Sequence, residues 1–451
     1  MRRRTAFTII ELLVSMALIV FIMAILAEAF VEGLKTFRNM KAIGDLNARL
    51  RMVQSMLRDD LSKDHFEGKR RLSDPYFWTS GPPKEGFFRV WHGSQLGVQG
   101  QPFYIEGGLG GSPDGIPSYY ATDHALQYTV KKRGNNRQDF YSAAVPANSP
   151  LRSLGTPDSR YQDTNANGTL ASYNSQWAEV AWFLRPTGTT AGAQPLFTLY
   201  RRQRVVVPST VLVIVATGQQ VDLNYQAPPG VAPWPLPLAS KSDYLEVSTS
   251  ISQQGKLFFN SPRDLTVPQR RFGMNPDFAL TSGGVPYHPY SQPVPSPLNA
   301  NSLSQLWYPI LALGPNPPLN YQSPNWRLDD EDGTAALQNN GTSPASMEGQ
   351  DVILTDVLSF AVIPIFSGVP TADFPPQYQN VNFPPGVSVF DTWSSQADDV
   401  YDYTLWDVGS ALPTSGTLVP NEGVITGLQI SIRVWDAKTT QTRQITIIQD
   451  L

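Results

Sequence analysis

The chain has 451 residues, a formal net charge of −4 and no cysteine, and 41% of its residues are hydrophobic. Without cysteine, disulfide frameworks, thiolate metal sites and cysteine nucleophiles are excluded, and the weakly acidic balance gives no basic field for binding nucleic acid. With 39 prolines, 34 glycines and only 16% charged residues, the composition favours a turn-rich, mostly β body with a substantial core.

The N-terminus combines a short basic leader with an apolar segment. Arg2 to Arg4 precede the run from Phe7 to Ala27, in which Glu11 is the one charged residue. As a helix this run would be about 31 Å long, close to the apolar thickness of a bilayer. Because positive charges stay on the cytoplasmic side, we expect a cytoplasmic N-terminus and an extracytoplasmic remainder. A secretory signal peptide is the alternative, but the run exceeds its usual apolar length.

The sequence after the apolar run continues the helical pattern. Five apolar residues recur at the spacing of a helical seam: Ile43, Leu46, Leu50, Val53 and Leu57. No proline occurs before Pro75. The pattern predicts one helix from Phe7 to about Ser62, with its first half in lipid and its amphipathic second half packed on the domain that follows.

Glu11 is the unusual residue of the apolar run. A carboxylate at the centre of a membrane helix is unfavourable by roughly 2.5–3.5 kcal/mol, and less near an interface. Such residues mark functional sites, whereas the alternative is a side chain that reaches the lipid head groups from the first helical turn.

The segment FTIIELLVSMALIVF (7–21) resembles the class III signal of type IV prepilins and type II secretion pseudopilins, in which a basic leader, a cleavage point, Phe and a glutamate at the fifth mature position occur in this order. The resemblance implies that a prepilin peptidase cleaves between Ala6 and Phe7 and N-methylates Phe7. The family has glycine before the cut, and this chain has Ala6. The resemblance also implies that Glu11 pairs with the α-amino group of a neighbouring subunit during assembly, where low dielectric strengthens the pair.

Residues 67–451 are expected to form one extracytoplasmic β-rich head. Strands are predicted at 86–91, 177–185, 196–207, 243–251 and 351–366, followed by a terminal hairpin of 427–436 and 441–451. Stretches rich in Pro, Gly, Ser and Asn separate them, at about 93–175, 220–240, 260–350 and 367–422, and are interpreted as loop insertions.

The order of these elements is similar to that of the J-type minor pseudopilin of type II secretion systems. The matching residues are the helix end LRMVQSMLRDDLSK, the strands VAWFLRP and LFTLYRRQRVVV, and the closing hairpin with ISIRVWD. The family's head is usually much shorter, so the resemblance leaves the insertions unexplained.

One stretch has the spacing of a calcium loop. In DTNANGT, Asp163, Asn165 and Asn167 fall at positions 1, 3 and 5 with Gly168 at 6, but position 12 is Asn174 instead of the bidentate glutamate. We therefore favour a surface turn, with a Ca²⁺ site as the alternative, and we expect no other cofactor.

No pattern in the chain indicates catalysis. The acidic clusters at 329–333 and 398–402 are typical of solvated loops. The four histidines are scattered, and no metalloprotease, nucleophile-elbow or phosphate-loop motif occurs. Tryptophans 91, 177, 182 and 435 fall in predicted strands, where packing is the usual role, with glycan binding as the alternative. YRRQR (200–204) is interpreted as one exposed strand face.

The sequence thus predicts an α+β, pilin-like protein with a leader (1–6), a transmembrane and assembly helix (7–66) and a head (67–451). The expected role is a minor pseudopilin-like structural subunit of the inner membrane, not an enzyme, with the head in the periplasm. Its expected partners are other pseudopilins or pilins, the prepilin peptidase, the assembly platform and membrane lipid, and no nucleic acid. The alternatives are a minor type IV pilin for adhesion or DNA uptake and a signal-anchored surface protein that does not polymerise.

Overall fold

A computed structural model describes residues 8–77, 83–92, 106, 113–116, 118, 120–122, 124–146, 149, 151, 170–192, 194–208, 212–214, 220–222, 236–237, 244, 246–251, 256–266, 270–271, 352–366, 388–392 and 425–451.

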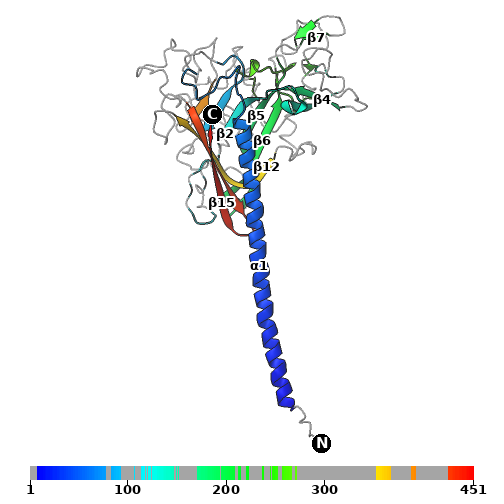
Figure 1. Cartoon of the computed structure of the whole chain (residues 1–451), viewed down its shortest axis with the longest axis vertical. Coiled ribbons are helices and arrows are strands. Elements are labelled where there is room, and N and C mark those ends of the chain that lie inside the picture. The colour runs from blue at the N-terminus through cyan, green and yellow to red at the C-terminus, as the bar shows by residue number, and fades with distance from the viewer. Residues whose placement is uncertain are drawn as a thin grey trace, which may run out of the picture.

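One helix, α1 (Ile9–Leu61), projects from a β-rich head (Figure 1). Its 53 residues give a length of about 80 Å at 1.5 Å per residue. Thr8 is its N-cap and Ser62 its C-cap. The continuous helix predicted from the sequence is confirmed over these residues, whereas Phe7, its expected first residue, lies outside the described part of the chain.

In the described part of the chain, eight strands form one antiparallel sheet. Their order across the sheet is β13 (Ser388–Asp391), β1 (Phe88–His92), β2 (Ala125–Lys131), β5 (Trp177–Ala191), β6 (Gln194–Val205), β12 (Val352–Phe366), β14 (Ile425–Asp436) and β15 (Gln441–Asp450).

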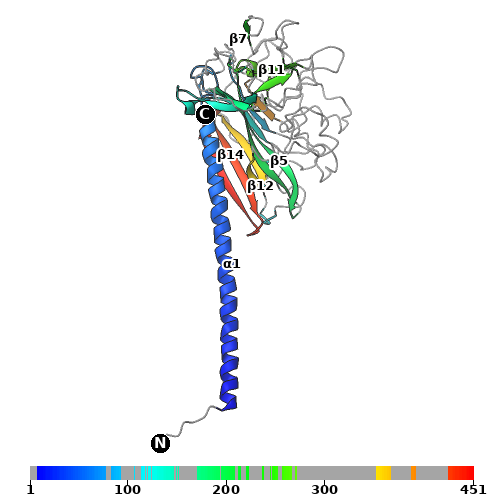
Figure 2. The ribbon, with the colours of Figure 1, turned by 90° about the vertical axis from the view of Figure 1, so that its right-hand side faces the viewer.

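The C-terminal half of α1 lies along one face of this sheet, so that β12, β14 and β5 run beside it (Figure 2). The C-terminus of the chain lies next to the C-terminal end of α1 in both views (Figures 1 and 2). The helix-facing side of the sheet is apolar, because alternate residues along each strand point to the same face. Leu126, Val180, Leu199, Phe360 and Ile430 belong to this buried core.

Smaller sheets extend the head. They consist of β3 (Tyr141–Pro146) with β4 (Leu170–Ser175), β7 (Leu212–Ile214) with β8 (Gln220–Asp222), and β10 (Thr249–Ile251) with β11 (Lys256–Phe259) and β9 (Leu236–Pro237). The described part of the head also contains 3-10 turns at Arg137–Asp139 and Asp264–Thr266.

The predicted terminal hairpin is confirmed, with ten consecutive cross-strand pairs between β14 and β15. Strands β1, β5, β6 and β12 also lie where they were expected. Of the described residues in the strand predicted at 243–251, only Thr249–Ile251 form a strand, β10.

The interpretation of 93–175 as a loop insertion was wrong. This stretch contains β3 and β4, and it contains β2, which occupies the middle of the main sheet between β1 and β5. The alternation of Leu126, Tyr128 and Val130 carries the period-2 signal of a strand, and the turn-rich residues around it concealed this signal. The stretch 367–422 likewise contains the edge strand β13.

The interpretation of YRRQR as an exposed strand face was also wrong. Arg202 and Arg204 are 4% exposed, and the Arg201 side chain is 14% exposed. The strand β6 is covered on both faces. Arg201 faces Asp60 of α1, and on the other face Ser248 Oγ donates to Glu179, the cross-strand neighbour of Arg204, at 2.7 Å.

Candidate functional site

The start of α1 is fixed by a reciprocal capping box. The Glu11 backbone N–H donates to Thr8 Oγ1 at 3.3 Å, and Glu11 Oε2 accepts from the Thr8 backbone N–H at 3.0 Å and from Thr8 Oγ1 at 3.0 Å. These bonds satisfy backbone donors that a helix N-terminus otherwise leaves free. The carboxylate also lies at the positive end of the helix dipole. The expected cleavage residues, Ala6 and Phe7, lie outside the described residues.

The first half of α1 makes no buried contact with the head. Its large apolar side chains are exposed, including Ile9 at 83%, Phe21 at 64% and Phe30 at 67%. Among the described residues, α1 is the one helix long and apolar enough to cross a membrane. A surface of this kind needs lipid or other apolar helices around it, because water disfavours so much contiguous apolar area.

The second half of α1 packs on the sheet. The core that α1 shares with the sheet contains Leu46, Leu50, Val53 and Leu57, all of them buried. Ile43, at the N-terminal end of this contact, is partly exposed. The helical seam read from the sequence is therefore the face that contacts the head.

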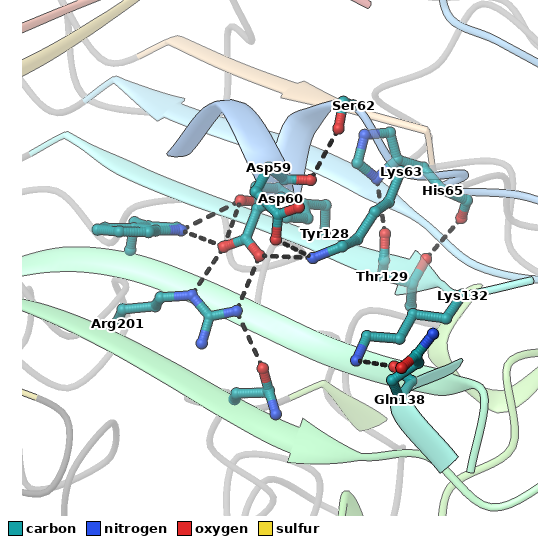
Figure 3. A network of polar contacts seen from close by, with 12 residues as sticks. Asp59, Asp60, Ser62, Lys63, His65, Tyr128, Thr129, Lys132, Gln138 and Arg201 are labelled. Carbon is teal, nitrogen blue, oxygen red and sulfur yellow. Dashed lines mark hydrogen bonds and ion pairs between the residues drawn. The ribbon is translucent and has the colours of Figure 1, made fainter. Parts of the chain in front are cut away.

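A buried carboxylate, that of Asp60, lies at the end of this contact, in the last turn of α1. Asp60 is 1% exposed, and it faces three neighbouring strands (Figure 3). From β6, Arg201 donates to both of its oxygens, through Nε at 2.7 Å and through a terminal nitrogen at 2.8 Å. From β5, Trp182 Nε1 donates at 3.2 Å, and from β2 the Tyr128 hydroxyl donates at 3.5 Å. Lys63 Nζ lies 3.5 Å from the second oxygen.

The electrostatics of this cluster follow from its burial. Burial alone lowers the pKa of Arg201, but hydrogen bonds and attraction from Asp60 outweigh it and raise that pKa. Burial, followed by the charge of Asp60, raises the pKa of Tyr128 well above its ordinary value, and the same two causes raise the pKa of Tyr141. The cluster is therefore a buried Asp60–Arg201 ion pair, with the neutral donors Trp182 and Tyr128 and the charged Lys63 side chain beside it.

The chain leaves α1 through a second set of buried bonds. His65 Nδ1 lies 2.7 Å from the Thr129 carbonyl oxygen, and Thr129 Oγ1 donates to the His65 carbonyl oxygen at 2.6 Å (Figure 3). Burial is the main cause that lowers the pKa of His65. Gly86 lies against this pair with φ at +83°, and a Cβ there would stand 2.1 Å from the His65 carbonyl oxygen. These contacts tie the end of α1 to β2 and to the start of β1.

A further buried ion pair lies on the sheet face that points away from α1. Glu106 is fully buried, and its Oε1 accepts from Arg433 at 2.6 Å while its Oε2 accepts from Ser118 at 2.9 Å and from Ser359 at 2.8 Å. Arg433 also donates to Asp114 at 2.7 Å. Glu106 and Asp114 are thus anchored to β12 and β14, as expected of a structural cross-link.

Most residues of the possible calcium loop fall outside the described part of the chain. Asp163, Asn165 and Asn167 lie outside the described residues, while Asn174, at position 12 of the possible calcium loop, lies in β4 and accepts from Ser142 Oγ at 2.5 Å. Within the described residues no group of three or more acidic or histidine side chains could hold a metal ion.

His65, His124, Trp177, Trp182 and Trp435 lie within the fold. His124 Nδ1 accepts from the Val362 backbone N–H at 3.0 Å, and His65 binds Thr129. Trp177 and Trp182 are buried, at 6% and 0% exposure, and Trp435 packs partly buried on a small cluster in the lower part of the sheet.

The sequence reading missed Asp60 and its partners. An acidic residue in the helical phase of the buried seam is the signal that could have revealed it, since Asp60 follows Val53 and Leu57 at seven and three residues. Its partner Arg201 could not have been chosen, because Arg202 and Arg204 next to it have the same charge and only the pleat of β6 decides which one faces α1.

A comparison of the chain with protein-family models, with curated proteins and with solved structures finds no match.

Proposed function

We propose that the chain is a minor pseudopilin-like structural subunit, anchored in the cytoplasmic membrane by α1 and assembled through it into a short filament that serves protein export. The observation that carries the proposal is the succession of basic leader, Phe7, Glu11 and uninterrupted apolar helix. The exposed first half of α1 supports it, because such a surface suits lipid before assembly and neighbouring helices afterwards.

The size of the head favours a minor subunit at or near the filament tip. The main sheet alone has eight strands in the described part of the chain, and further segments cover its second face. A subunit that repeats along a filament would crowd its neighbours with this bulk, whereas nothing stacks above a tip subunit.

N-terminal sequencing of the protein extracted from membranes tests the proposal. The expected product begins with N-methylated Phe7. An intact Met1, or a first residue beyond Ala27, would refute the assignment and favour a signal-anchored or secreted protein. Co-isolation with sister subunits, a secretin and an assembly ATPase is the expected companion result for a secretion system, and purification with a pilus would favour the minor type IV pilin instead.

The role of Glu11 in assembly can be separated from its role in capping α1. Glutamine also serves in a capping box, so Glu11→Gln keeps the bonds to Thr8 and removes the charge. Thr8→Ala removes the cap and keeps the charge. We expect Glu11→Gln to abolish co-isolation with partner subunits and Thr8→Ala to leave it largely intact. The reverse order would show that helix capping, and not the charge, is what assembly requires.

A further inference from the structure

The apolar seam of α1 does not by itself define where the helix sits along the sheet. A shift of four residues moves a helix by about 6 Å, a little more than one turn. Such a shift toward the C-terminal end would replace Leu46, Leu50, Val53, Leu57 and Leu61 by Ala42, Leu46, Arg49, Val53 and Leu57. Four of these five replacements are apolar. Within the seam, the main feature that disfavours the shifted register is Arg49, which would take the buried place of Val53.

The buried carboxylate distinguishes the two registers. In the shifted helix Met56 would occupy the place of Asp60, and Arg201 would face an apolar side chain. A buried charge that loses its partner is strongly destabilising. The donors that converge on Asp60 come from three adjacent strands, so that one axial position of the carboxylate satisfies all of them.

Stability alone does not account for this arrangement. A carboxylate in the last turn lies at the negative end of the helix dipole, and a buried ion pair is often no more stable than apolar residues of similar volume. The best-attested use of a buried polar group in an apolar helix contact is to define register.

We infer that Asp60 and Arg201 are positioning residues that fix the axial register of α1 on the head. Because the first half of α1 is the segment that suits a membrane, this register sets the height at which the head stands above the bilayer. A slip by four residues would change that height by about 6 Å. The inference concerns the packing of one chain and does not depend on filament assembly.

Distance measurement between two spin labels tests the inference in the full chain in detergent. The chain has no cysteine, so Lys35→Cys and Lys438→Cys supply the only labelling sites, and both lysines are exposed. Lys35 lies in the exposed part of α1, and Lys438 lies at the tip of the β14–β15 hairpin, which runs beside the helix (Figure 1). Pulsed electron paramagnetic resonance then reports axial movement. The substitution Arg49→Leu provides a background in which the seam tolerates both registers.

With Asp60 and Arg201 intact, we expect one distance, both in the parent chain and in the Arg49→Leu background. Adding Asp60→Leu and Arg201→Leu to that background is expected to produce a second population displaced by about 6 Å. The inference is overturned if the parental distance persists alone, or if Arg49→Leu by itself produces the second population. Should the leucine pair fail to fold, Asp60→Asn with Arg201→Gln is measured by the same criteria.

Discussion

Replacing Arg201 by methionine removes the charge that faces Asp60 and keeps most of the side-chain volume. The two shortest contacts of the carboxylate, at 2.7 and 2.8 Å, disappear. The contacts that remain are longer: Trp182 at 3.2 Å, and Tyr128 and Lys63 at 3.5 Å. Removing one partner of a buried ion pair generally destabilises a protein by about 3–5 kcal/mol. Because Lys63 still supplies a positive charge, we expect the lower end, about 3 kcal/mol.

Guanidinium unfolding of the full chain in detergent, followed by tryptophan fluorescence, measures this loss. Trp182 is fully buried, donates to Asp60 and lies against the Arg201 guanidinium, so its fluorescence reports on the junction. Arg443→Met is the matched control, because Arg443 lies partly exposed on the edge strand β15, and a change of less than about 0.5 kcal/mol is expected there.

Combining Arg201→Met with Asp60→Leu separates the lost ion pair from lost packing. This double variant leaves no unpaired charge, so we expect it to recover most of the stability. A loss below about 1 kcal/mol in Arg201→Met, or a double variant no more stable than the single one, would refute the reasoning.

Three further predictions concern the rest of the head. Gly86→Ala is expected to lower the free energy of unfolding by more than about 2 kcal/mol, and Gly68→Ala by about 1 kcal/mol. Both glycines have a positive φ, but only at Gly86 would a Cβ collide with a backbone oxygen. Equal losses in the two variants would contradict the steric argument. Because burial lowers the pKa of His65, the unfolded chain binds a proton first as pH falls below about 6.5, and stability should fall by up to about 1.4 kcal/mol per pH unit. Unfolding midpoints between pH 7.5 and 5.5 test this, and a slope unchanged by His65→Asn would exclude His65 as its cause. Glu106→Gln leaves buried Arg433 facing a neutral amide, and the free energy of unfolding is expected to fall by about 1–3 kcal/mol. A decrease in melting temperature smaller than that caused by a surface substitution would contradict this expectation.

The long helix and the terminal hairpin could be predicted because both carry local periodicity. The seam from Leu46 to Leu57 repeats at helical spacing, and Leu428, Ile430 and Ile432 alternate at strand spacing, so each pattern needs only its own residues. The leader motif around Phe7 and Glu11 is equally local. The hypothesis about function therefore stems from the sequence.

The position of β2 in the sheet and the pairing of Asp60 with Arg201 were decided by the tertiary structure alone. Arg201 is 141 residues from Asp60 in the chain, and Glu106 is 327 residues from Arg433. No local pattern encodes which of several arginines meets which acid, because that choice depends on strand order, register and pleat. By itself the sequence determined that a long apolar helix must join a β-rich head. Where the helix ends on that head was decided only by the packing of three strands around one buried carboxylate. The reason is that a buried charge is stable only where its partners converge.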